Sequence, residues 1–148
     1  MNVQPIIWGG LIAGTLDLIA ACASAWLRSG VQPVRVAQFI ASGVLGAASF
    51  TGGAKSAALG VAFHFMIATV AAAVFYVSSR KFLVLIERPI TFGLLYGVVV
   101  HLFMTQVILP LSNVTQRPVT LSGFIIGVLI IMFFVGLPIA LVVRRFSR

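Results

Sequence analysis

Apolar residues form long runs along the chain, and polar or basic residues separate these runs. A helix of about 20 apolar residues crosses a bilayer. Four runs reach that length, and they cover residues 6–27, 57–78, 90–111 and 121–143. The pattern therefore predicts four transmembrane helices. A polar loop at 112–120, which contains Pro118, separates the last two.

A fifth stretch, residues 34–50, is shorter and more polar than the other four. Its polar and small residues fall on one helical face: Arg35, Gln38, Ser42, Gly46 and Ser49. One interpretation is an amphipathic helix that lies in the membrane interface. The other is a short span whose polar face contacts neighbouring helices.

The basic residues discriminate between four and five spans, because Lys and Arg mark the cytoplasmic side of a membrane protein. With four spans the two sides hold six and four basic residues, and with five spans they hold eight and two, the two being Lys55 and Arg117. The asymmetry favours five transmembrane helices in a single all-α domain over 1–148. The N-terminus is then outside and the C-terminus cytoplasmic. The alternative is four spans plus an interfacial or re-entrant helix at 34–50.

Composition supports a membrane protein. The chain is 61% hydrophobic and 8% charged, whereas soluble domains are about 45–50% apolar and about 25% charged. A net charge of +8 would suggest nucleic-acid binding in a soluble protein. Here the basic residues lie at the ends of apolar runs, where they contact lipid headgroups. We therefore expect membrane lipid, and not nucleic acid, as a partner.

Three spans carry glycine pairs spaced by four residues, which let two helix backbones approach closely. The pairs are Gly10 and Gly14, Gly93 and Gly97, and Gly123 and Gly127. They predict a compact bundle, and they suit a homo-oligomer or a subunit of a larger membrane complex. Gly136 and Pro138 predict a kink in the last span.

Three ionisable side chains lie deep inside the spans: Asp17, His64 and His101. At about 1.5 Å per residue, each is roughly 15–17 Å from its membrane face, near the midplane. Each also lies on a face of small residues, which points it at a neighbouring helix. A charge at the midplane costs at least about 2.5–3.5 kcal/mol, so such groups are paired or hydrated. We expect the three to form one intramembrane polar site.

Several uses of such a site remain open. Each histidine could simply make one interhelical hydrogen bond, with Asp17 accepting from a neighbour. The three residues could also pass protons or a small solute, or ligate a divalent metal. His64 and His101 could hold a haem iron, although no CxxCH motif supports this.

The sequence shows no soluble-enzyme motif, and its only acidic residues are Asp17 and Glu87, so we expect no enzymatic activity. Two functions remain. The first is a small transporter or channel that acts through Asp17, His64 and His101. The second is a non-catalytic accessory or scaffold subunit whose glycine faces dock a partner.

Several short motifs give the chain a family resemblance. They are GTLD (14–17), FIASGVLG (39–46), SFTGG (49–53), LGVAFHFMIA (59–68), RPITFGLLYG (88–97), LPLS (109–112) and GLPIAL (136–141). With these motifs the chain resembles a family of small bacterial inner-membrane proteins to which no activity is attached. The resemblance covers nearly the whole chain. It implies a bacterial inner membrane, and it implies neither an activity nor site residues.

Overall fold

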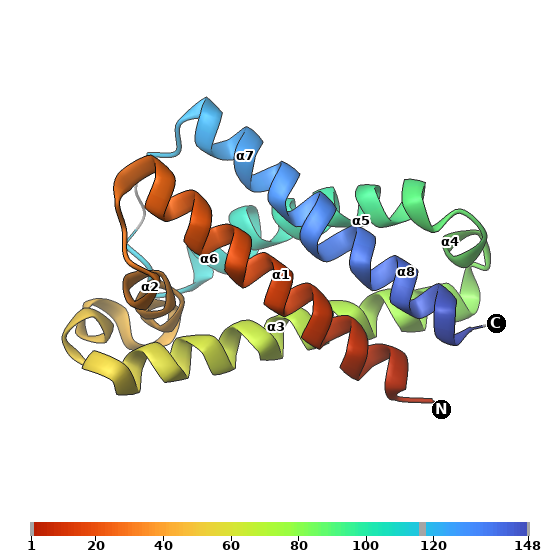
Figure 1. The fold of residues 1–148 in the computed structure, drawn as a ribbon, viewed down its shortest axis with the longest axis horizontal. Helices are drawn as coiled ribbons and strands as arrows, with labels where there is room; N and C mark the ends of the chain where they lie inside the picture. Colours follow the sequence, from red (N-terminus) through yellow and green to blue (C-terminus); the bar gives the residue numbers. More distant parts are fainter. Residues whose placement is uncertain (1, 116–117, 148) are drawn as a thin grey trace.

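The computed structural model describes residues 2–115 and 118–147. Helices dominate this part of the chain, and no strand occurs in it (Figure 1). The elements in order are α1 (Gln4–Ser29), α2 (Pro33–Leu45), the 3₁₀-helix η1 (Gly46–Thr51), α3 (Gly53–Lys81), α4 (Val84–Glu87), α5 (Pro89–Phe103), the π-helix η2 (Met104–Ile108), α6 (Leu109–Leu111), α7 (Leu121–Ile131), the π-helix η3 (Met132–Gly136) and α8 (Leu137–Phe146).

Five helical segments in the described residues are long and apolar enough to cross a membrane. They are Gln4–Ser29, Pro33–Thr51, Gly53–Lys81, Pro89–Leu111 and Leu121–Phe146. The predicted all-α bundle and its five apolar helices are therefore confirmed. The last two segments are composite, because a short π-helix interrupts each of them.

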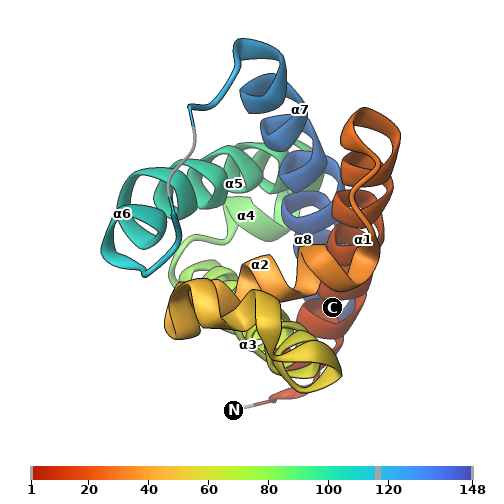
Figure 2. The same cartoon turned by 90° about the vertical axis from the view of Figure 1, so that its left-hand side faces the viewer.

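Helices α1 and α3 are antiparallel. Gly10 faces Thr69 and Gly14 faces Phe65, so residue numbers rise along α1 as they fall along α3. Segment Pro33–Thr51, which connects them, consequently begins and ends at the same end of the bundle. Figures 1 and 2 show α2 lying across that end. Segment Pro33–Thr51 is one of the five candidate spans, but it does not run from end to end of the bundle as the other four do.

The other long segments also alternate in direction. Gly93 of α5 faces Ala140 of α8, and Gly97 faces Met132, so these helices are antiparallel as well. Both chain ends therefore lie at one end of the bundle (Figure 1), where Asn2 and Ser147 line a common cavity. The expectation of termini on opposite sides of the membrane assumed that 34–50 runs from end to end, and it stays a prediction.

The polar face of α2 points into the protein. Gln38 is 3% exposed and Ser42 is 2% exposed. The Gln38 Nε2 donates to the Gly53 carbonyl at 3.2 Å, which ties α2 to the start of α3. The outward residues include Val34, Phe39 and Val44. Of the two placements of this face, contact with neighbouring helices is the one observed.

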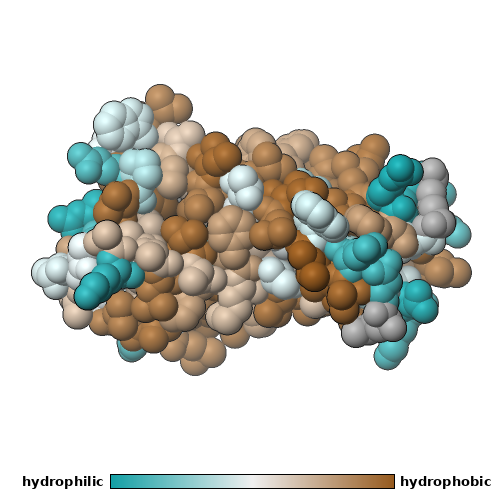
Figure 3. All heavy atoms as spheres, turned by 60° about the horizontal axis from the view of Figure 1, so that its bottom comes forward, coloured by the Kyte–Doolittle hydropathy of each residue, from teal (hydrophilic) through white to brown (hydrophobic). Residues whose placement is uncertain are grey.

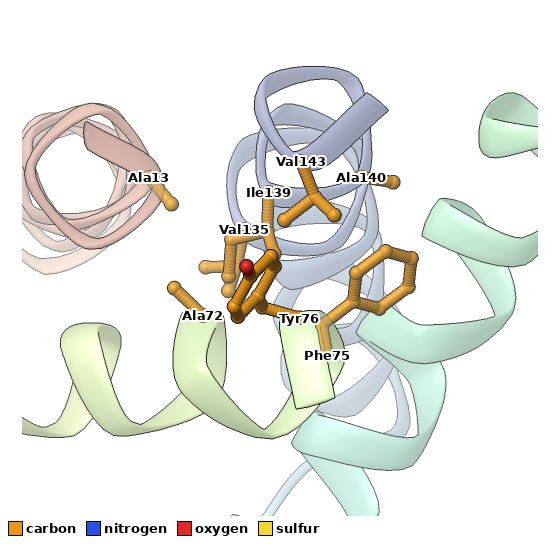
Figure 4. Packing of buried hydrophobic residues seen from close by; sticks show 8 residues of the cluster. All are labelled: Ala13, Ala72, Phe75, Tyr76, Val135, Ile139, Ala140 and Val143. Carbon is orange, nitrogen blue, oxygen red and sulfur yellow. The ribbon is translucent and has the colours of Figure 1, made fainter. Parts of the chain in front are cut away.

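The buried core lies toward the end that carries the termini. Figure 4 shows its eight residues, which come from α1, α3, η3 and α8: Ala13, Ala72, Phe75, Tyr76, Val135, Ile139, Ala140 and Val143. Small alanines on α1, α3 and α8 leave room between the helices for the larger side chains of α3 and α8, among them Phe75 and Ile139. Nearby, the Tyr96 hydroxyl of α5 donates to the Ala71 carbonyl at 2.7 Å, which joins α5 to α3.

The outer surface is apolar around the middle of the bundle. Figure 3 shows hydrophobic side chains over the centre of one face and hydrophilic ones toward both ends. Val70, Leu95 and Leu129 are among the large apolar side chains that point outward. Soluble monomers rarely expose contiguous apolar patches larger than a few hundred Å². This surface, with the five apolar helices, suits a multi-pass membrane protein. Arg117 and Arg148, two of the residues counted for topology, lie outside the described residues.

Candidate functional site

Asp17 of α1 and His64 of α3 meet across the interface of their two helices. The His64 Nε2 lies 2.8 Å from the Gly14 carbonyl oxygen and 3.9 Å from the Asp17 Oδ2. Because a carbonyl oxygen can only accept, this nitrogen carries a proton and donates to Gly14. The same N–H also faces the carboxylate. The two side chains are 13% (His64) and 18% (Asp17) exposed.

The glycine face of α1 creates this contact. A Cβ at Gly14 would lie 2.8 Å from the Phe65 ring and 3.2 Å from the Ala68 Cβ, so any larger residue would push α3 away. The close approach also leaves the Gly14 carbonyl accessible to His64. Gly14 therefore lets the two helices approach and supplies an acceptor of the site.

The pair lies deep along the bundle. Asp17 is about 20 Å along α1 from Gln4 and about 18 Å from Ser29, at a rise of 1.5 Å per residue. A carboxylate at this depth in a membrane needs a partner, and His64 is the ionisable side chain that lies beside it.

His101 lies at a different interface, between α5 and α7. It is 6% exposed, and its ring packs edge-on against Phe124 with centroids 5.1 Å apart. Gly127 makes room for this ring, since a Cβ there would lie 2.8 Å from the His101 Cε1. Neither ring nitrogen has a hydrogen-bond partner among the described residues.

The structure thus brings together two of the three ionisable residues expected to form one site. Among the residues that the structure describes, no group of three His, Cys, Asp or Glu side chains is placed to hold a metal ion. The haem and divalent-metal hypotheses stay predictions. The carbonyl of Gly14 is the site member that sequence reasoning missed. Its signal in the sequence is a glycine three residues before Asp17, on the face that meets α3.

The glycine faces contact segments of the same chain. Gly10 and Gly14 meet α3, Gly93 and Gly97 meet the last long segment, and Gly127 meets His101. Gly123 has the Thr120 hydroxyl and the Arg28 guanidinium as its nearest neighbours. The close backbone approach that the glycine spacing predicts is therefore used inside the chain.

Carboxylate and imidazole side chains inside a membrane are the groups from which proton relays are built. The ring offers two nitrogens, and Gly14 engages only one of them. Asp17 and His64 together make a protonatable pair between two long apolar helices. A search of family models, of curated proteins and of solved structures gives no match to this chain.

Proposed function

We propose that this chain is an integral membrane protein that passes protons across the bilayer through the Asp17–His64 pair. The observation that carries the proposal is the 3.9 Å approach of the His64 Nε2 to the Asp17 Oδ2, midway along α1. Ionisable residues inside a membrane typically mark ion pathways and proton relays. His101 is not part of the proposed pathway, since it contacts α7 instead of the pair.

The two ring nitrogens of His64 suit a relay. The Nδ1 has no hydrogen bond among the described residues, so it is free to take up a proton. Uptake gives an imidazolium, which the Asp17 carboxylate stabilises at short range. Transfer of the other proton from Nε2 to the Asp17 carboxylate, 3.9 Å away, then returns a neutral ring, and the Asp17 carboxyl passes that proton on. One proton has entered at one nitrogen and one has left at the other, and rotation or proton exchange restores the starting tautomer.

The proposal includes four crossings with both termini on one side of the membrane. The antiparallel pairing of α1 with α3 supports it, as does the position of the two chain ends. By the positive-inside rule the terminal side is cytoplasmic, because it carries more basic residues. The described ones are Arg80, Lys81, Arg88, Arg144 and Arg145. The family resemblance favours a bacterial inner membrane as the location.

Proton flux into liposomes tests the function. The purified protein is reconstituted with a pH-sensitive dye inside the vesicles, and a potassium diffusion potential drives protons inward. We expect flux above that of empty liposomes, and we expect Asp17→Asn and His64→Gln to abolish the difference. His101→Gln is the matched control and keeps the flux. Thermal unfolding confirms that each variant is folded.

Two results would contradict the proposal: no flux from the folded wild-type protein, or equal flux from wild type, Asp17→Asn and His64→Gln. The first would favour the accessory-subunit function. That alternative has less support in its original form, because the glycine faces that were expected to dock a partner contact helices of the chain itself.

A further inference from the structure

A groove of about 230 Å³ lies between the second half of α1 and α7. Its walls include Ala21, Ser24 and Arg28 from α1, and Gly123, Gly127 and Ile130 from α7. On each helix these positions are three or four residues apart, so they lie on one face of that helix. The groove therefore runs along the helices, for about 10 Å at a rise of 1.5 Å per residue.

Small residues line this groove, yet the two helices do not close on each other. Elsewhere in the bundle such faces bring backbones together, as at Gly10 and Thr69. Here the end of α1 and the start of α7 lie at the same end of the bundle as α2 (Figure 2), and the groove lies between the side chains of the two helices. The space left between them is an open groove, lined by alanine and isoleucine side chains and by Ser24, Ser29 and Arg28.

The mouth of the groove is cationic and polar. The Arg28 Nη2 lies 3.5 Å from the Ser122 hydroxyl, which it reaches across the groove. The Thr120 hydroxyl, which accepts from the Gly123 N–H at 3.1 Å, lies beside it. Arg28 is exposed at the end of α1. The cation therefore lies where a helix leaves the membrane.

No acidic residue of the chain neutralises Arg28. The sequence has two. Asp17 pairs with His64, and Glu87 lies at the opposite end of the bundle, where it lines a cavity with Arg144. Among the described residues the charge at the groove mouth is thus uncompensated. The group that would balance the Arg28 charge is therefore an anion from outside the protein.

We propose that this groove binds one anionic phospholipid. The phosphate lies at the Arg28 guanidinium and the Ser122 hydroxyl, and one acyl chain lies between α1 and α7. A guanidinium matches phosphate geometry by donating two parallel hydrogen bonds. The apolar floor and the direction of the groove along the helices match a fatty-acyl chain and offer nothing to free phosphate. This binding site is separate from the Asp17–His64 pair and does not depend on it.

Lipid retention by the purified protein tests the proposal. The protein is exchanged into nanodiscs or detergent with phosphatidylglycerol or phosphatidylcholine of identical acyl chains, and bound lipid is counted by native mass spectrometry. We expect selective retention of phosphatidylglycerol. Arg28→Gln should weaken it about fivefold, the effect of one basic residue near an anionic headgroup. Lys55→Gln, which removes an exposed cation at the same end of the bundle, should leave it unchanged.

A second variant tests the contribution of the groove to lipid binding independently of the Arg28 charge. Ser24→Leu keeps Arg28 but fills the groove, and we expect it to lose the retained lipid as well. Equal retention of the two lipids, or equal retention by wild type and Arg28→Gln, would overturn the proposal. Displacement of phosphatidylglycerol by millimolar inorganic phosphate would instead assign the mouth to free phosphate and also overturn it. Bound lipid is counted without any flux measurement. A failure of the lipid proposal is therefore distinct from a failure of the proposed proton pathway.

Discussion

Single glycines make the closest contacts in this bundle. Gly60 of α3 lies directly against the Ala37 carbonyl of α2, and Gly136 lies against the Gly93 carbonyl of α5. At such positions two helices meet backbone to backbone, which any side chain would prevent. In a membrane, where apolar side chains gain nothing by leaving lipid, this packing is a main source of association.

Replacing Gly60 by alanine should loosen α2 from α3. The added Cβ would overlap the Ala37 carbonyl and lie 3.1 Å from the Ala41 nitrogen, both backbone atoms that cannot rotate away. We expect a loss of about 1–3 kcal/mol, the usual cost of overpacking, measured as lower stability in detergent. Gly43→Ala is the control, because its Cβ would lie 3.8 Å from the Ser112 Cβ, an ordinary contact. Equal stability of the two variants would contradict the close approach of α2 to α3.

His101 should tolerate an apolar replacement. Its ring is buried and neither nitrogen has a hydrogen-bond partner among the described residues, so the ring contributes packing while its polar atoms cost free energy. We expect His101→Leu to unfold at the same temperature as wild type or a higher one. His64→Leu should unfold at a lower temperature, because it leaves the Asp17 carboxylate without its imidazole. A larger loss from His101→Leu than from His64→Leu would show that the assignment is reversed.

The sequence predicted part of the site. Depth along a span and position on a small-residue face were enough to single out Asp17 and His64. They could not exclude His101, which has the same depth and also lies on a glycine face. The depth of a side chain along its span gives only its position along the membrane normal. Which helices are neighbours depends on the contacts of the whole bundle, and His101 faces α7 because Gly127 leaves room there.

Helix α2 shows what charge counting assumes. Arg35 was counted as a marker of the cytoplasmic side, which assumes that its charge stays in water or at lipid headgroups. In the structure its Nη1 donates to the Phe50 carbonyl at 3.1 Å, and the guanidinium lies over the Phe50 ring. Arg35 is nonetheless exposed, so its charge can still lie in water or at lipid headgroups. The spacing of the polar residues in 34–50 predicted the polar face of this helix, but it could not predict the direction in which the helix runs.

The two π-helices have a common local cause. Segment η2 ends two residues before Pro110, and η3 ends two residues before Pro138. Proline lacks an N–H and its ring collides with the carbonyl four residues earlier. A π-helical turn, in which backbone hydrogen bonds join residues five apart instead of four, accommodates both effects. The disturbance at Gly136 and Pro138 was predicted from the sequence, whereas the equivalent one before Pro110 was not recognised.

The two ends of the bundle are built differently. The buried core of α1, α3 and α8 lies toward the termini. At the opposite end α2 lies across the helices and the α1–α7 groove opens. The protonatable pair lies between these two parts, on helices that the core holds together.

The direction of every long helix can be tested by labelling. Cys22 is the only cysteine, so Cys22→Ser gives a thiol-free parent into which Asn2→Cys, Thr51→Cys or Ser147→Cys is introduced. All three positions are exposed. With a membrane-impermeant maleimide on oriented vesicles, we expect residues 2 and 147 to react from one side and residue 51 from the other. The parent stays unlabelled, and permeabilised vesicles label all three.

Labelling of residues 2 and 147 from opposite sides would contradict more than the topology. An odd number of crossings requires two consecutive long segments, such as α1 and α3, to run in the same direction. Gly10 could then not face Thr69 while Gly14 faces Phe65, since those contacts require opposite directions. The same reversal would separate Asp17 from His64, because their contact continues that antiparallel series. Topology and proton pathway are therefore linked, and the labelling experiment tests the geometric condition on which the pathway depends.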